Sequence, residues 1–244
     1  SLCEMKEPEK IGIYSNSMNK LDVLHFNSDS LLYVKTLHFP LWNKQRGIPK
    51  AYTRLIQYND SLFIGTSFMP KEISVELMNL KTEKVVNSVN FPLKPKEGEY
   101  SRPYECKIAT EMNFIVAAYR YINRLEIYKL SDQKFQLNTI IGDANNQYDL
   151  YRLNKDNEMI LHYSDIVCGK NQIYALYRGV KEKELSSANS KIEVYSYDGT
   201  HLRTFDLGRS IEKILVDESS MRIYAFDRNE EKDIVFCYAI ESNT

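Results

Sequence analysis

The chain has 244 residues, 43% of them hydrophobic, and this length is enough to bury a core without support from disulfides. Its 32 Lys and Arg residues against 33 Asp and Glu residues give a formal net charge of −1, which excludes the basic excess of a typical nucleic-acid-binding domain. The longest apolar run, residues 114–118, is far shorter than the roughly 20 residues of a membrane-spanning helix, so no transmembrane segment is expected.

A unit of short strands recurs at intervals of roughly fifty residues, a period that indicates a repeat architecture. In each of the last four units a polar, turn-forming cluster precedes an apolar strand, and a segment that alternates apolar and polar residues follows it. In chain order the predicted strands are residues 11–14 and 21–24, then 62–65 and 73–77, then 114–117 and 125–128, then 173–176 and 192–195, then 223–226 and 234–238.

Outer strands close several of these units. Asp198-Gly199 separates residues 192–195 from the strand expected at 202–205, and Asp-Gly is a strong signal for a two-residue hairpin turn. One four-stranded sheet cannot cover both of its faces, whereas radial stacking of copies can. We therefore predict an all-β chain that forms a single β-propeller domain, residues 1–244, with four-stranded blades. Five units are recognisable, and a sixth blade would require residues 142–163 or 1–10 to contribute.

The C-terminal third resembles a known family. Residues 163–166, 173–179, 192–199, 214–218 and 223–225, in that order, are similar to the TolB-like six-bladed propeller family of bacterial envelope proteins. The resemblance implies export, location in the periplasm or on the surface, and in many members attachment as a lipoprotein; it implies no reaction. Cys3 is then a candidate lipid anchor, and the polar residues 4–10 beyond it would make residues 1–10 a flexible tether; the alternative is an ordinary cysteine.

Motifs with a known catalytic mechanism are absent from the sequence. It contains no G-x-S-x-G elbow, no H-E-x-x-H, no P-loop and no dinucleotide fingerprint. Asp143, Asn145 and Asp149 faintly resemble a calcium loop, but the glycine and the closing glutamate of such a loop are missing, so a solvated turn is the better interpretation.

Candidate site residues come from propeller geometry, because the starts of the innermost strands gather around one mouth of a central channel. Aligning the units places Thr53 and Arg54, Glu105, Asp165 and Glu212 near equivalent positions. Such a group would bind a sugar, a basic side chain of a partner, or Ca²⁺ or another divalent ion; otherwise it only keeps the mouth hydrated. No cofactor other than this ion is expected.

Three hypotheses about function remain open. The first is a non-enzymatic binding or scaffold propeller of the bacterial cell envelope that recognises a protein or a glycan through one rim. The second is a metal-dependent hydrolase of lactonase type that uses Glu105, Asp165 and Glu212. The third is a structural member with no ligand site. Residues 179–189, inserted into the most regular unit, form a candidate recognition loop.

Overall fold

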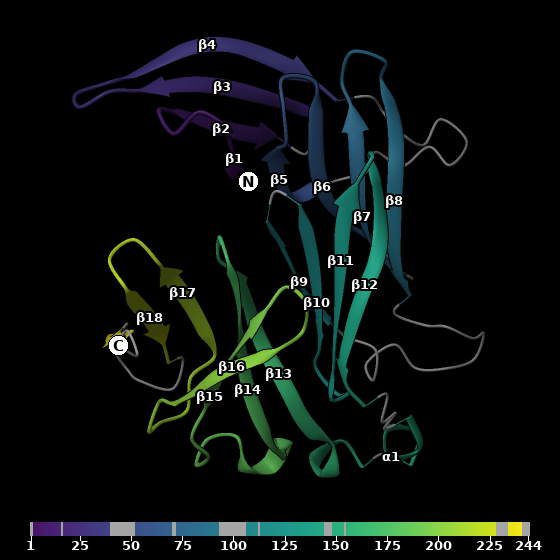
Figure 1. Cartoon of the computed structure of the whole chain (residues 1–244), viewed down its shortest axis with the longest axis vertical. Helices are drawn as coiled ribbons and strands as arrows, with labels where there is room; N and C mark the ends of the chain where they lie inside the picture. Colours follow the sequence, from purple (N-terminus) through teal and green to yellow (C-terminus); the bar gives the residue numbers. More distant parts are fainter. Residues whose placement is uncertain are drawn as a thin grey trace. The chain divides into compact units, whose positions relative to one another are not determined.

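The computed structural model describes residues 2–15, 17–39, 52–69, 72–92, 106–111, 113–143, 148–153, 155–227 and 234–240. Nearly all regular structure in these residues is β, as predicted, and the exceptions are one short helix, α1 (Tyr148–Arg152), and the 3₁₀ turns η2 (Asp156–Glu158) and η3 (Glu182–Glu184). The strands form five blades of a β-propeller (Figure 1). The chain divides into two compact units, Ser1–Pro92 with Ser131–Phe135, and Leu93–Leu130 with Gln136–Thr244.

The first unit contains two blades that share one eight-stranded sheet. The strands of its first blade are β1 (Leu2–Glu4), β2 (Lys10–Ser15), β3 (Lys20–Phe26) and β4 (Leu31–His38). Those of its second blade are β5 (Tyr52–Gln57), β6 (Leu62–Met69), β7 (Glu72–Asn79) and β8 (Lys84–Pro92). The innermost strands β1 and β5 pair in parallel, with Cys3 opposite Leu55, and this pairing joins the two blades.

The N-terminal segment differs from the prediction. Leu2–Glu4 is a strand paired on both sides, with β2 and with β5, whereas the sequence led us to expect a flexible tether over residues 1–10. Cys3 is 3% exposed and packs in a core cluster with Tyr14 and Leu55. A lipid on the Cys3 sulfur would have to displace β1 from this core, so the position argues against the predicted anchor.

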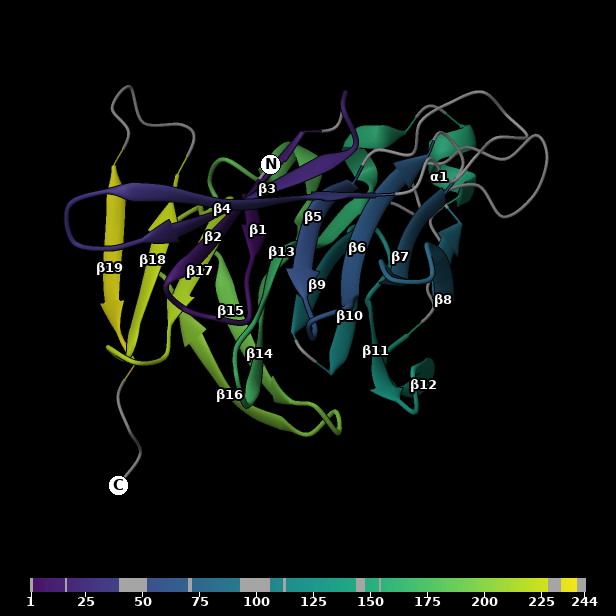
Figure 2. The same cartoon turned by 90° about the horizontal axis from the view of Figure 1, so that it is seen from above.

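The second unit contains three blades (Figure 2). The first consists of β9 (Cys106–Glu111), β10 (Phe114–Tyr119), β11 (Arg124–Ser131) and β12 (Lys134–Gly142), although the β11–β12 turn is assigned to the first unit. The second consists of β13 (Ile160–Cys168), β14 (Gln172–Lys181), β15 (Lys191–Ser196) and β16 (His201–Asp206). The third has β17 (Lys213–Asp217), β18 (Arg222–Phe226) and β19 (Val235–Ala239).

Local sequence explains why these strands form and turn where they do. In β15 the alternation of Ile192 and Val194 with Glu193 buries the two aliphatic side chains completely and leaves the carboxylate partly exposed. The β15–β16 turn places Gly199 at φ 92°, a left-handed conformation that glycine adopts without strain. The Asp198 side chain accepts a hydrogen bond from the Thr200 amide at 3.0 Å and closes this turn.

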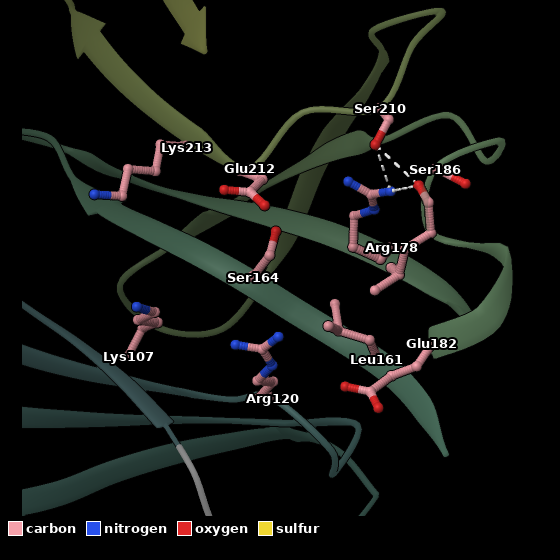
Figure 3. Close-up of a pocket in the computed structure, with 11 residues that line it drawn as sticks. Lys107, Arg120, Leu161, Ser164, Arg178, Glu182, Ser186, Ser210, Glu212 and Lys213 are labelled. Atoms are coloured by element: carbon pink, nitrogen blue, oxygen red, sulfur yellow. Dashed lines mark hydrogen bonds between the residues drawn. The ribbon is translucent and has the colours of Figure 1, made fainter. Parts of the chain in front are cut away.

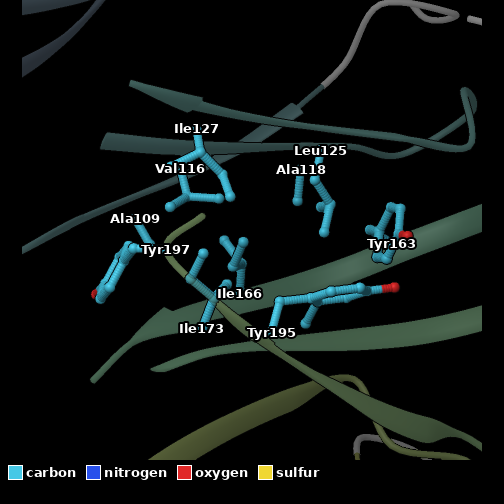
Figure 4. Packing of buried hydrophobic residues seen from close by; sticks show 11 residues of the cluster. Ala109, Val116, Ala118, Leu125, Ile127, Tyr163, Ile166, Ile173, Tyr195 and Tyr197 are labelled. Carbon is cyan, nitrogen blue, oxygen red and sulfur yellow. The ribbon is translucent and has the colours of Figure 1, made fainter. Parts of the chain in front are cut away.

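Apolar side chains fill the spaces between neighbouring blades of the second unit. Val116, Leu125 and Ile127 from one blade face Ile166 and Tyr195 from the next, and Figure 4 shows the two sets pointing toward each other. A corresponding cluster lies between the next two blades. Several tyrosines of this unit are also removed from solvent: Tyr119, Tyr121, Tyr174, Tyr195 and Tyr197 are buried, and Tyr177 is partly buried.

Candidate functional site

A polar cavity of about 390 Å³ lies within the second unit, where the innermost strands β9, β13 and β17 begin and β10 and β14 end. All three blades of the unit contribute to it, together with the loop that follows β14. We call it the basic cavity. The residues that line it are Lys107, Arg120, Leu161, Ser164, Arg178, Glu182, Leu185, Ser186, Ser210, Glu212 and Lys213 (Figure 3).

Arg178 organises one wall of the basic cavity. It is 6% exposed, and its guanidinium donates hydrogen bonds to the carbonyls of Ile211, at 2.7 Å, and Leu185, and to the Ser210 hydroxyl at 2.9 Å. Burial lowers the pKa of Arg178, and the negative charge of Glu212 opposes this effect. Because its donors hold backbone groups of two different loops, Arg178 fixes the shape of the cavity.

The loop after β14 is anchored on both sides. The Glu182 amide donates to the Met159 carbonyl at 3.0 Å, and Ser190 exchanges hydrogen bonds with Ile211, whose amide reaches the Ser190 hydroxyl at 2.7 Å. This is the insertion at residues 179–189 that the sequence indicated as a candidate recognition loop. It supplies Glu182, Leu185 and Ser186 to the cavity.

Arg120 occupies the opposite wall. It follows β10 directly, and its carbonyl accepts a hydrogen bond from the His162 amide at 2.7 Å, which ties it to β13. Its guanidinium carbon lies 5.4 Å from the centre of the Tyr121 ring. The Nε atom is buried and has no hydrogen-bond partner among the described residues. Figure 3 shows the terminal nitrogens of Arg120 directed into the cavity, below Ser164.

The charges around the basic cavity are unequal. Lys107, Arg120, Arg178 and Lys213 carry positive charge, and the carboxylates are Glu182 and Glu212. One Glu182 oxygen accepts a hydrogen bond from the Tyr121 hydroxyl. Four cations against two carboxylates give the lining a formal charge of +2, whereas the whole chain has a net charge of −1.

Of the four predicted site residues, the structure places Glu212 in the lining of the basic cavity. Asp165, on β13, does not line it: its Oδ2 accepts a hydrogen bond from the Ile214 amide at 3.0 Å, which links β13 to β17. Burial raises the pKa of Asp165, while Lys107 and Lys213 act against this. Arg54 is exposed on β5 of the other unit, and Glu105 lies outside the described residues.

The metal-ligand hypothesis gains no structural support. Within the described ranges, no three His, Cys, Asp or Glu side chains are grouped as a metal site would require. Asp165 has one oxygen committed to a backbone amide. Asn145 of the calcium-like loop lies outside the described residues. No helix in the described part of the chain is long and apolar enough to cross a membrane.

None of the four cations that line this cavity was among the residues predicted for the site. Lys107 is two residues from Glu105, and Lys213 and Ser164 are next to Glu212 and Asp165. In a strand, adjacent residues point to opposite faces, so a shift of one residue separates Asp165 from Ser164, which lines the cavity. For Arg120 and Arg178, the one sequence feature that could have indicated a place in the site is an arginine at or near the end of a buried strand.

Comparison of the sequence with a family profile identifies the family of this chain. A profile of the TolB-like 6-blade propeller-like family matches residues 3–219. The chain belongs to this family. For this TolB-like chain the match extends well beyond the C-terminal third in which the resemblance was evident. No curated protein matches the chain.

Solved structures with a similar fold have low sequence identity to this TolB-like chain. The WD40 domain of Toxoplasma gondii coronin is 9% identical, with 98% of this chain and 54% of that chain covered and a TM-score of 0.53. A putative 6-phosphogluconolactonase from Bacteroides uniformis is 14% identical, with 99% and 67% covered and a TM-score of 0.52. BamB from Moraxella catarrhalis is 9% identical, with 99% and 59% covered and a TM-score of 0.49.

These similarities concern the fold alone. The TolB-like chain spans between 54% and 67% of the length of these three structures.

Proposed function

We propose that this chain is a non-enzymatic binding propeller of the bacterial cell envelope, and that it recognises a protein or glycan partner through the rim that contains the basic cavity. The observation that carries the proposal is the construction of this rim. Three blades and an inserted loop together form a cavity in which nine of the eleven lining residues are polar or charged. Loops held on a rigid scaffold are common carriers of recognition, and the loop over residues 179–189 is held in this way.

Location in the envelope rests on membership of the TolB-like family and on what the resemblance implies for that family. Cys3 is buried in the described structure, and the proposal does not depend on a lipid at this residue. We infer also that both units belong to one propeller domain, residues 1–244, because strands of one repeated pattern run through both.

The metal-dependent hydrolase has less support. Of its three proposed ligands, Asp165 accepts a backbone hydrogen bond, Glu212 lies among cations, and Glu105 is outside the described residues. The structural similarity to a putative lactonase, at 14% identity, concerns the fold only. We therefore offer no second function.

A site-specific photo-crosslinker tests the proposal. It is placed at Ser186, which is exposed on the loop of the cavity, and as a control at Lys129, which is exposed on β11 away from it. Both proteins are irradiated with envelope extract and with immobilised glycans. We expect a saturable adduct from Ser186 and none from Lys129. Equal labelling from both positions, or none from Ser186, contradicts recognition through this rim.

A further inference from the structure

Among the described residues, the lining of the basic cavity carries more positive than negative charge. No ion pair joins Lys107, Arg120 or Lys213 to a carboxylate among the described residues. Asp165 acts electrostatically on both lysines, but its Oδ2 is bound to the Ile214 amide. We propose that the basic cavity binds the carboxylate or phosphate group of a sugar-sized ligand, with Arg120 as its main contact. This inference deepens the proposed function and rests on it, because it names the chemical group recognised at the same rim.

The two arginines have different roles. The terminal nitrogens of Arg178 donate hydrogen bonds to the backbone carbonyls of Leu185 and Ile211 and to the Ser210 hydroxyl, so Arg178 shapes the wall of the basic cavity. The side chain of Arg120 has no such backbone contacts in the described structure, and its terminal nitrogens point into the cavity (Figure 3). A planar guanidinium presents paired donors that match the oxygens of a carboxylate or a phosphate. Arg120 is therefore the side chain arranged to receive an oxyanion.

The remaining lining residues fit the same ligand. Lys107 and Lys213 are exposed at the cavity from two different blades, and Figure 3 shows their ammonium groups on one side of Arg120. The Ser164 hydroxyl lies above Arg120, and its bond to the Leu176 carbonyl is long, at 3.5 Å, so this hydroxyl is available for a ligand hydroxyl. A cavity of about 390 Å³ is within the range of small-molecule sites.

The two carboxylates do not cancel this preference. Glu182 is held at one oxygen by the Tyr121 hydroxyl, and Glu212 acts electrostatically on the buried Arg178. Glu212 therefore offsets the positive charge of the buried Arg178, and Glu182 is oriented by a neutral hydroxyl. With the charge of Arg178 offset by Glu212, the three cations Arg120, Lys107 and Lys213 still outnumber the one remaining carboxylate, Glu182, in the lining.

Isothermal titration calorimetry with the full chain tests the inference. The probes are inorganic phosphate, D-glucuronate and glucose 6-phosphate, with D-glucose as the neutral comparison, at about 50 mM and about 300 mM NaCl to measure screening. We expect the anions to bind, glucose not to bind, and affinity to fall at high salt. Tighter binding of glucuronate identifies a carboxylate ligand, and tighter binding of the two phosphates identifies a phosphate ligand.

Variants separate a specific site from general surface charge. Arg120→Gln is expected to weaken anion binding at least about tenfold, and Glu212→Gln to strengthen it severalfold. Arg152→Gln, which removes an exposed arginine on α1, is the matched control and is expected to bind as the wild type does. If Arg120→Gln unfolds, the double variant Lys107→Gln/Lys213→Gln, which alters only exposed side chains, replaces it.

The outcomes distinguish this inference from the proposed function. Absence of anion binding, or equal binding by Arg120→Gln and the wild type, overturns the inference, and a Ser186 adduct that persists then leaves the proposed function intact. Anion binding that depends on Arg120, without any Ser186 adduct, supports the cavity as a small-molecule site and removes the macromolecular partner.

Discussion

Substitutions at Asp165 test whether this carboxylate, predicted to bind a ligand, instead stabilises the fold through its hydrogen bond to the Ile214 amide. Its Oδ2 accepts the Ile214 amide at 3.0 Å, and Ile214 is 6% exposed. Asp165→Ala leaves this buried amide without its acceptor, and a hydrogen bond to a charged group contributes about 1.5–3 kcal/mol. Removing a partly desolvated carboxylate offsets some of this loss. We therefore expect Asp165→Ala to lower the free energy of unfolding by about 1–2 kcal/mol.

The Asn variant should behave differently. Its amide oxygen can still accept the Ile214 hydrogen bond, so Asp165→Asn is expected to change the free energy of unfolding at pH 7 by less than about 0.5 kcal/mol or to raise it. Burial raises the pKa of Asp165 in the folded state, so the folded chain holds this proton more tightly than the unfolded chain does. Its contribution to stability is therefore complete below the unfolded pKa of about 4 and falls as the pH rises through the higher folded value.

Urea denaturation followed by far-UV circular dichroism at pH 4, 5.5 and 7 measures both effects. The control is Asp149→Asn, because the Asp149 side chain is 82% exposed. The pH dependence due to Asp165 should disappear in the Asn variant and persist in the control. If Asp165→Asn costs as much as Asp165→Ala, or if Ca²⁺ stabilises the wild type but not the Asn variant, the structural interpretation is refuted and a ligand role is restored.

Two other buried polar groups lead to further predictions. Burial lowers the pKa of His162, so the contribution of this neutral side chain to stability is present above pH 6.5 and is lost as the pH falls below that value. In thermal melts between pH 7.5 and 5, His162→Phe should reduce this loss of stability. The control variant His201→Gln, at an exposed position, should not reduce it. Tyr52 donates a hydrogen bond to the buried Glu76 at 2.7 Å, so Tyr52→Phe should lower the free energy of unfolding in urea by about 2 kcal/mol. Tyr33→Phe, at an exposed position, should change it by less than about 0.5 kcal/mol, and equal effects of the two substitutions would contradict the argument.

The repeated strands were predictable because each carries its own signal. Residues 192–195 alternate, residues 173–176 are continuously apolar, and Asp198-Gly199 marks the turn that β15 and β16 share. β1 was missed because three residues are too few to show a period, and its pairing with β5 depends on a strand about fifty positions away. The sequence likewise contains no local signal that Cys3 is buried.

The candidate site was predictable only as a region. The sequence pointed separately to the starts of the innermost strands and to the loop at residues 179–189, and both contribute residues to the basic cavity. The side chains that face the cavity depend on register: Asp165 turns to the Ile214 amide, and its neighbour Ser164 faces the cavity. Arg120 enters the site through the contact between β10 and β13, which belong to different blades, and no pattern within one blade reveals such a contact.

The most direct test of the central claim, that the basic cavity is the binding site of this propeller, is a crystal structure determined after soaking with selenate. Selenate is a tetrahedral oxyanion whose selenium is located by anomalous scattering. We expect an anomalous peak within the cavity, in contact with the Arg120 guanidinium and between it and Lys107 or Lys213. Peaks only outside the cavity, or an Arg120 side chain turned away from an empty cavity, would contradict it.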